Sequence, residues 1–441
     1  MKTASLSRRQ FLRGAGVLIV SFNLFPPGSK LFAQTPLPDG ELDPQSLDSW
    51  LAISPDGTVT FFTSKVEIGT GIQTALAQII AEELDVPFER VILDSGDTTK
   101  SIEQGSTVGS RTIERAGPQV RQAAAAARQE LLKLASGRLG APVEKLTVQN
   151  GIVSVAGASS KKVSYGELIG GKKFNTRITA TGTGWDMKVA PEVKAKDPKD
   201  YKIVGSSMRR VELPAKVTGE HTYVHDVRVP GMLHGRVIRP PVVNTEPISI
   251  DQDSVRGIPG VVMIAREGKF VGVVAKTEWA AIKAADALKV TWSKPTTKLP
   301  ASTDDLFAYL KNNKPVRSQK PVDKGDLNSA FSQAKKTYQA SYRWPFQMHG
   351  MIGPSCAIAD VKGDKATIWS GAPRPFQNAR DGGKAIEHSG AECSHYLSRG
   401  FRLLRSHEHR RWRRRRRPAL ARGGGAGARA VVPARRTRLG T

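Results

Sequence analysis

The stretch from Lys65 to Val91, KVEIGTGIQTALAQIIAEELDVPFERV, joins the end of a strand to a glycine turn and an amphipathic helix. Apolar residues such as Leu76, Ile80 and Leu84 recur at helical spacing, and Pro87 ends the pattern. Backbone N–H groups at a glycine turn can approach a phosphate, whose charge the helix N-terminus favours. Most such glycine pairs are only tight turns, so the turn by itself leaves both interpretations open.

Strand and helix signals continue on both sides of this stretch. Residues 49–71 alternate apolar and polar side chains around Pro55-Asp56-Gly57, which predicts a β-hairpin, and residues 88–97 predict a strand. Residues 117–140 form an Ala-rich helical pattern, and residues 151–169 predict another hairpin. The first part of the chain therefore mixes helices and strands.

Changes in composition divide the rest of the chain. A stretch rich in Lys, Pro and Asp separates the first unit from a strand-rich unit, and a second linker precedes a third unit of short strands. The predicted segments are 1–34, a first unit at 45–182, a linker at 183–204, a second unit at 205–295, a linker region at 296–334, a third unit beginning at 335–381, and a tail at 382–441.

The positive charge is concentrated at the C-terminal end. The net charge is +27, and residues 391–441 hold 15 Arg against two acids, a net of +13 that leaves +14 for the preceding residues. Such charge is typical of nucleic-acid or anionic-surface partners. The two cysteines, Cys356 and Cys393, are too few for an iron–sulfur centre with about four ligands, a disulfide framework or an all-cysteine zinc site.

The N-terminus has the order of a signal peptide. The adjacent Arg8 and Arg9 precede a Phe-Leu pair and an apolar run, and Ala33 marks a small-residue cleavage site. The run is shorter than the roughly 20 residues that a membrane-spanning helix needs. We therefore expect residues 1–34 to be a twin-arginine signal that exports the folded protein to the periplasm, with an ordinary secretory signal as the alternative.

Two further stretches carry candidate polar groups. Residues 104–111, QGSTVGSR, offer a loop of many hydrogen-bond donors, with the planar guanidinium of Arg111 suited to phosphate. Residues 345–350, PFQMHG, place Gln347 and His349 in an apolar strand context. A solvated loop and an ordinary buried histidine are the alternative interpretations. The residues alone therefore indicate an exported α+β enzyme or binding protein.

Taken in order, these stretches resemble the large, molybdenum-binding subunits of the xanthine dehydrogenase and aldehyde oxidase family, in the branch of nicotinate dehydrogenase and isoquinoline 1-oxidoreductase large subunits. The resemblance covers about residues 45 to 380. The matching segments are residues 65–91, QGSTVGSRT at 104–112, KVTGEHTYVHDVRVPGMLHGRVIRPP at 216–241, and FQMHGMIGPSCAIADV at 346–361.

The resemblance implies an α+β fold in which pieces of a molybdopterin-binding domain flank an α/β hammerhead domain. Residues 45–182 would form the first molybdopterin-binding region, residues 205–295 the hammerhead domain, and residues 335–381 the start of the second molybdopterin-binding region.

The resemblance also implies roles for individual residues toward molybdopterin cytosine dinucleotide. Gln347 would bond the molybdenum oxo group, and Ala372-Pro373 replaces the Thr-Gln that the family usually has there. Residues expected to hold the dinucleotide end are Gly69, Gly71, Thr74 and Gln78. Residues expected to hold the pterin and its phosphates are Gly105, Ser106, Thr107, Gly109, Ser110 and Arg111.

The implied reaction is oxidative hydroxylation of an N-heteroaromatic or aldehyde C–H carbon with water, in which a glutamate acts as base. No residue of this chain matches that glutamate, so no catalytic residue and no protein ligand to a metal is assigned. The electrons would pass to a separate small subunit with two [2Fe-2S] clusters, and a cytochrome c is one possible final acceptor. The other partner is a small-molecule substrate, and no nucleic acid is expected.

The tail departs from the family pattern. Where the family continues with Gly-Ser-Gly-Cys-Tyr-Gly, this chain has RGFRLLR, and codons for Gly400 to Leu404 read one base later permit Gly-Ser-Gly-Cys-Tyr. We therefore expect residues 382–441 to be a frameshifted, disordered tail and the chain to be an inactive C-terminally truncated fragment. A basic nucleic-acid-binding arm is the rival interpretation, and a cofactor-free binding or scaffold remnant of the family is another.

Overall fold

The computed structural model describes residues 42–190, 193–347, 353–362, 365–387, 392–397 and 429–431. The chain divides into two compact units, and the boundary falls between Pro214 and Ala215 rather than after residue 204. The predicted signal segment 1–34 and His349 lie outside the described residues.

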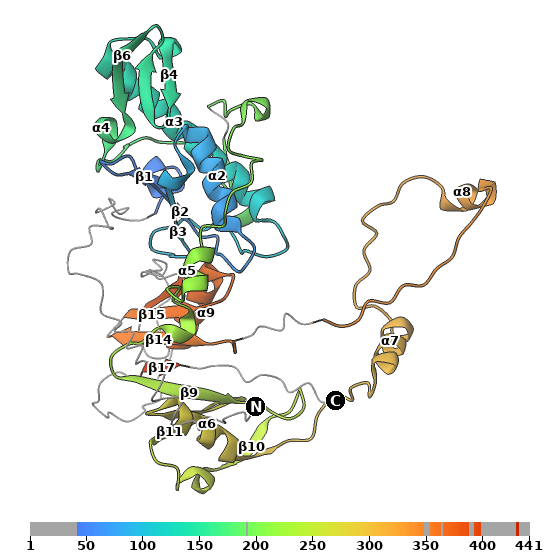
Figure 1. The fold of residues 1–441 in the computed structure, drawn as a ribbon. Helices are drawn as coiled ribbons and strands as arrows, with labels where there is room; N and C mark the ends of the chain where they lie inside the picture. Colours follow the sequence, from blue (N-terminus) through green and yellow to red (C-terminus); the bar gives the residue numbers. More distant parts are fainter. Residues whose placement is uncertain are drawn as a thin grey trace, which may run out of the picture. The chain divides into compact units, whose positions relative to one another are not determined.

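The first unit combines two long helices with short strands (Figure 1). Its helices are α2 (Ile72–Leu84), α3 (Gly117–Leu139) and α4 (Tyr165–Ile169), and α5 (Leu213–Thr218) lies at the boundary between the units. Its strands are β1 (Leu51–Ile53), β2 (Val59–Thr63), β3 (Val91–Ser95), β4 (Leu146–Gln149), β5 (Ile152–Val155), β6 (Ala158–Ser164), β7 (Ala180–Thr181) and β8 (Lys188–Val189).

The opening stretch, Lys65 to Val91, supplies the crossover helix that connects two strands of one sheet. Strands β1 and β2 form the predicted hairpin, with Gly57 at a φ of 83° in the turn, and β3 pairs parallel to β2. Helix α2 makes the crossover and begins at Ile72, directly after the glycine turn. Its apolar face, including Leu76 and Ile80, is fully buried in one core with Trp50 and Phe61. Burial of this face holds α2 against the sheet and fixes the turn at its N-terminus.

Helix α3 packs beside α2 and ends where its sequence predicts. Gly140 follows the helix with a φ of 62°, a left-handed conformation that glycine adopts without a Cβ clash. A π-helical turn at Thr112–Ala116 precedes the helix. Strands β5 and β6 form the predicted hairpin, β4 adds a third antiparallel strand that was not predicted, and β6 leads into α4.

The stretch at 183–204 differs from the predicted linker because it packs on the first unit. Met187 and Val189 are buried in the core. Lys196 pairs with Asp85, and the N–H groups of residues 202 to 204 donate to Glu82. The stretch is polar because most of these contacts join a lysine side chain or a backbone N–H group to an acidic side chain of the first unit.

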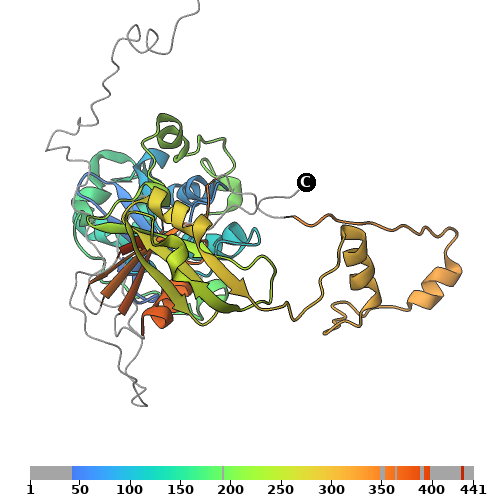
Figure 2. The ribbon, with the colours of Figure 1, turned by 90° about the horizontal axis from the view of Figure 1, so that it is seen from below.

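The second unit is built on a mixed sheet in the order β11-β12-β9-β17-β14-β15-β16. Helix α6 lies against β9 and β12, and Figure 2 shows this yellow helix on one face of the yellow-green strands. The strands are β9 (Met232–Ile238), β10 (Pro247–Asp251), β11 (Val261–Glu267), β12 (Phe270–Ala275), β13 (Lys289–Trp292), β14 (Ala357–Lys362), β15 (Lys365–Ser370), β16 (Glu392–Leu397) and β17 (Arg429–Val431). The helices are α6 (Glu278–Ala287), α7 (Thr303–Asn312), α8 (Leu327–Gln333) and α9 (Pro375–Glu387).

The described residues of the tail differ from the expected disorder. Helix α9 continues to Glu387, β16 pairs parallel to β15, and β17 pairs with β9 and β14. The prediction averaged composition over the whole tail, whereas short segments such as residues 392–397 can join a sheet through backbone hydrogen bonds alone.

The predicted α+β class is confirmed by the elements of both units. In the part of the chain that the structure describes, no helix combines the length and the apolar character required to cross a membrane.

Candidate functional site

The glycine turn before α2 is the first predicted site, and its backbone donors bond to the chain's own carboxylate. Glu67 Oε1 accepts from the N–H groups of Gly69 at 2.7 Å and Gly71 at 2.9 Å, and Glu67 Oε2 accepts from Gln73 N–H at 3.3 Å. The Glu67 side chain is only 6% exposed and lies 3.4 Å from Arg210 Nη2. Glu67 therefore supplies the negative charge that the helix N-terminus favours.

Thr74 and Gln78, the other two residues of this group, also bond within the chain. Thr74 Oγ1 accepts from Val211 N–H at 3.0 Å, and Gln78 Nε2 donates to the carbonyl groups of Ile203 at 2.9 Å and Ser206 at 3.0 Å. These bonds fasten the end of the first unit to α2. The geometry does not support the predicted dinucleotide contact, because a phosphate at this turn would have to displace the resident carboxylate.

The loop at residues 104–111 is the second predicted site, and the backbone N–H groups between its first and last residues are unbonded. Gly105, Gly109 and Ser110 have φ angles of 78°, 63° and 56°. Within residues 42–190, which the structure describes without a gap, none of the N–H groups of residues 105 to 110 donates a hydrogen bond. Successive unbonded N–H groups in turn conformations form a concavity that binds anions. Ser110 holds a left-handed conformation without being glycine, and such strain clusters at functional sites.

Two buried polar side chains fix the base of the loop. Gln104 Oε1 accepts from Ser64 N–H at 3.2 Å, and Gln104 Nε2 donates to Gln119 Oε1 on α3 at 3.3 Å. Thr107 Oγ1 accepts from Val66 N–H at 3.1 Å. The segment that follows β2 and the N-terminal turns of α3 thus hold the loop between them.

Lys65 is fully buried beneath the same loop. Its Nζ donates to the carbonyl oxygens of Gly105 at 2.9 Å and Ser106 at 3.1 Å. Burial disfavours the charged amine and lowers the pKa of Lys65 from 10.5 to about 8. The amine is therefore still mostly protonated at neutral pH.

Trp185 closes one side of the loop. Its Nε1 donates to the carbonyl oxygen of Ser106 at 2.9 Å, and the guanidinium carbon of Arg111 lies 5.1 Å from the ring centroid. A Cβ on Gly105 would lie 2.4 Å from Trp185 Cδ1, so only glycine fits there. The indole thus orients an exposed Arg111 beside the open N–H groups.

The structure brings together all the residues predicted at this loop, which are Gly105, Ser106, Thr107, Gly109, Ser110 and Arg111. Sequence reasoning missed Lys65, Gln119 and Trp185. The one signal in the sequence that could have indicated Lys65 is its position at a predicted strand end, where the residues on both sides of it are apolar or hydroxylic.

Gln347 is exposed and lies in an irregular stretch of the second unit. At the departure from the family pattern, Ala372 N–H donates to Ser370 Oγ at 3.2 Å after β15. Within the described residues, no group of three or more His, Cys, Asp or Glu is placed to hold a metal ion.

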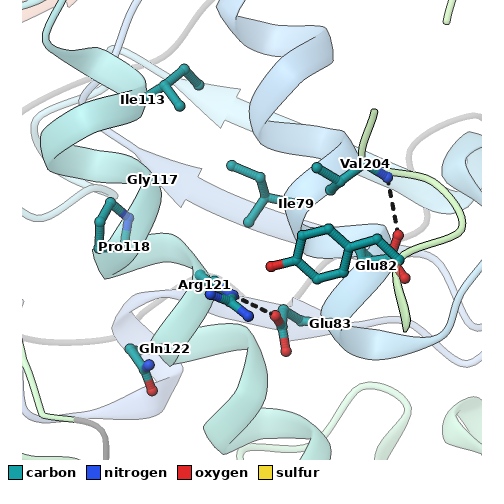
Figure 3. A pocket seen from close by; sticks show the side chains of 10 residues that line it. Ile79, Glu82, Glu83, Ile113, Gly117, Pro118, Arg121, Gln122 and Val204 are labelled. Atoms are coloured by element: carbon teal, nitrogen blue, oxygen red, sulfur yellow. Dashed lines mark hydrogen bonds and ion pairs between the residues drawn. The ribbon is translucent and has the colours of Figure 1, made fainter. Parts of the chain in front are cut away.

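A pocket of about 260 Å³ lies between α2, α3 and residues 201–204 (Figure 3). Glu83 Oε1 accepts from Arg121 Nε at 2.7 Å, and Glu82 Oε2 accepts from the N–H groups of residues 202 to 204. Burial would raise the pKa of Glu82, but these three bonds and the charge of Lys196 outweigh it and lower the pKa. Both carboxylates are therefore committed to holding the fold together.

The model of the molybdopterin cofactor-binding domain matches residues 2–240, more than half of the chain. The chain therefore belongs to this domain family, as found in the molybdenum-binding subunits of the xanthine dehydrogenase group. The family predicted from the sequence motifs is thus confirmed.

Within the family, the chain is similar to one of the subunits of nicotinate dehydrogenase from Pseudomonas putida, with 39% identity over 84% of the chain and 30% of the relative. It is 30% identical to the beta chain of isoquinoline 1-oxidoreductase from Brevundimonas diminuta, over 66% of the chain and 41% of the relative. The chain thus spans less than half the length of either relative. A solved structure, quinoline 2-oxidoreductase from Pseudomonas putida 86, aligns with 44% of the chain and 30% of its own at 15% identity and a TM-score of 0.33.

Proposed function

We propose that the loop at residues 104–111 holds an anionic, oxygen-rich part of a molybdenum cofactor. The observation that carries this proposal is the run of open N–H groups from Gly105 to Ser110, with the exposed guanidinium of Arg111 beside it. A phosphate needs several converging donors and a positive charge, and the loop offers both. Family membership supports a molybdenum cofactor as the ligand.

We further propose that the whole protein is the large subunit of a molybdenum hydroxylase. When bound, the molybdenum centre supplies the redox chemistry that hydroxylates an N-heteroaromatic or aldehyde C–H carbon with oxygen from water. The part of this chain is to bind and orient the cofactor. Arg111 and the backbone donors neutralise phosphate charge, and Trp185 holds Arg111 and the Ser106 carbonyl in place.

The finer proposal is that the cofactor is the cytosine dinucleotide, which rests on the resemblance of the sequence motifs. Because Glu67 occupies the donors at Gly69 and Gly71, the proposal assigns no dinucleotide contact to that turn. An iron–sulfur subunit as electron acceptor, with a cytochrome c beyond it, rests on the same resemblance.

Export by the twin-arginine route is also proposed, because Arg8 and Arg9 precede an apolar run. Changing both residues to Lys should leave the precursor in the cytoplasm. Cell fractionation measures the export, and unimpaired export of this double variant would refute the assignment.

The test of the cofactor site compares Arg111→Ala with Arg115→Ala in the purified chain. Arg115 is a matched control, because it is also partly exposed, lies one turn further on and pairs with Glu114. Loss of a charge-assisted phosphate contact should lower affinity for a cytidine pyrophosphate by about 10- to 150-fold in Arg111→Ala, since such a contact contributes about 1.5–3 kcal/mol. The control should bind as the unchanged chain does.

Molybdenum content and the cytidine monophosphate released by acid hydrolysis give a second readout. The proposal expects both in chain isolated from cells that make the cofactor, and less of both in Arg111→Ala. Equal cofactor content in Arg111→Ala and Arg115→Ala would refute the loop assignment. Absence of molybdenum, of cytosine nucleotide and of pyrophosphate binding in the unchanged chain would favour a cofactor-free scaffold.

A further inference from the structure

Lys65 is a buried cation with backbone partners only. Its side chain is fully buried, and its Nζ donates to the carbonyl oxygens of Gly105 and Ser106. Among the described residues it forms no ion pair, and burial is the one cause that shifts its pKa. Burying an ammonium without an opposite charge is costly, and a second role besides holding two carbonyl groups would account for that cost.

The planar peptide bond relates these carbonyl groups to the open donors of the loop. In a trans peptide the C=O of one residue points opposite to the N–H of the next. The carbonyl groups of Gly105 and Ser106 point toward Lys65 Nζ, so the N–H groups of Ser106 and Thr107 point away from it. A positive charge at the oxygen polarises the peptide and makes its N–H a stronger donor.

We propose that Lys65 is a positioning residue that sets the affinity of the 104–111 loop for anions, both by turning the N–H groups of Ser106 and Thr107 outward and by lending them its positive charge. The inference rests on the proposed function of the loop and adds to it a residue that does not touch the ligand. The ligand chemistry is a phosphate or sulfate oxyanion.

The charged groups around Lys65 leave it as the one titrating candidate. Arg111, on the loop itself, stacks on the ring of Trp185. Glu67, two residues along the chain, directs its carboxylate to the turn before α2, and Asp186 next to Trp185 is exposed. Residues 42–214 contain no His and no Cys.

Protonation of Lys65 and binding of an anion should therefore favour each other. The amine carries its charge below its pKa of about 8 and loses it above. Anion affinity of the loop should fall as pH rises through this value, and a bound anion should raise the pKa of Lys65 by the same coupling. A lysine that only braced the loop would give no such pH step.

The experiment measures binding of sulfate to the whole chain by calorimetry from about pH 7 to about pH 9.5, a range in which sulfate keeps its charge. A unit charge one peptide behind the donors, at an effective dielectric constant of about 20, should change the Kd by roughly tenfold. Lys65→Met should bind about tenfold more weakly at pH 7 and show no pH step, since it keeps the length of the side chain without the charge. Lys65→Arg should bind sulfate with the same Kd at both ends of the pH range.

Lys133→Met is the matched control, because it removes one positive charge from an exposed site on α3. It should keep both the affinity and the pH step. If Lys65→Met does not fold, the pKa of Lys65 in the unchanged chain can be followed by NMR of its Cε, and saturating sulfate should raise it by about one unit.

The outcomes separate this inference from the proposed function. If sulfate binding depends on Arg111 but shows no pH step, and sulfate leaves the pKa of Lys65 unchanged, the role of Lys65 is refuted and the loop assignment stands. If Arg111→Ala binds sulfate as well as the unchanged chain does, the loop itself is not the anion site and both fail.

Discussion

Replacing Glu67 by Ala tests whether a carboxylate of the chain has taken the place of a ligand at the N-terminus of α2. The change removes the acceptor of three backbone N–H groups, those of Gly69, Gly71 and Gln73. It also removes the more distant of the two carboxylates that pair with Arg210, which keeps Glu212. Water can reach the exposed Gly69 in the variant, so the loss is smaller than three charge-assisted bonds. A lost cap of about 1–2 kcal/mol and a lost dipole interaction of about 0.3–1 kcal/mol give roughly 1.3–3 kcal/mol in total.

Hydrogen exchange of the α2 amides measures this loss locally. A loss of about 1.3–3 kcal/mol should speed exchange in residues 72–84 by about 10- to 150-fold if local opening governs it. The exchange rate in Glu67→Gln should fall between those of the unchanged chain and Glu67→Ala, because the amide oxygen of Gln still accepts hydrogen bonds but carries no charge. The control is Glu144→Ala, which removes an exposed carboxylate elsewhere in the same unit.

Sulfate should rescue the Ala variant by occupying the vacated donors, and it should leave α2 of the unchanged chain as it was. Unchanged exchange in Glu67→Ala would show that the carboxylate does not stabilise the helix. Faster exchange that sulfate does not reverse would show that the turn is not shaped for an oxyanion once the carboxylate is gone.

Three further outcomes follow from the contacts around the two helices. The pKa of Lys65 is lowered, so the unfolded chain binds more protons than the folded chain between about pH 8 and 10.5. The free energy of unfolding should therefore rise with pH across this range, by up to about 3 kcal/mol. Urea unfolding measures this rise, which should be missing in Lys65→Met. The pKa of Glu82 is also lowered, so its contribution is present above pH 4.5 and lost as pH falls below it, and the stability difference between the unchanged chain and Glu82→Gln should shrink in acid. Gly105→Ala should displace the indole of Trp185, seen as a shift of its N–H resonance, whereas Gly109→Ala, whose Cβ meets nothing closer than 3.9 Å, should not.

The elements around the glycine turn could be predicted because their signals are local. The spacing of Leu76, Ile80 and Leu84 predicts α2, and Gly140 predicts the end of α3. The structure also places the six predicted residues of the second loop together, since they are neighbours in the sequence. Local pattern was therefore sufficient wherever a feature depends on residues one or two turns apart.

The occupants of the two loops could not be predicted, because they depend on which distant side chain arrives. A glycine pair before a helix predicts open donors but not the carboxylate of Glu67 that fills them. Lys65 and Trp185 reach the second loop across 40 and 79 positions of the sequence. The stretch at 183–204 was interpreted as a linker for the same reason, since its lysines meet their acidic partners only in the folded unit.

The two glycine turns differ in their unbonded donors rather than in their glycine content, and the proposed anion site follows the donors. Both turns present backbone N–H groups with φ above zero, and both lie before a long helix. At the first turn Glu67 already satisfies the donors. An incoming phosphate would therefore gain only the difference between its own interaction free energy with these donors and that of the carboxylate. At the second turn no carboxylate competes among the described residues, and Lys65 adds charge from behind. An incoming phosphate there would gain the whole interaction, and for this reason we propose the anion site at residues 104–111 rather than at the first turn.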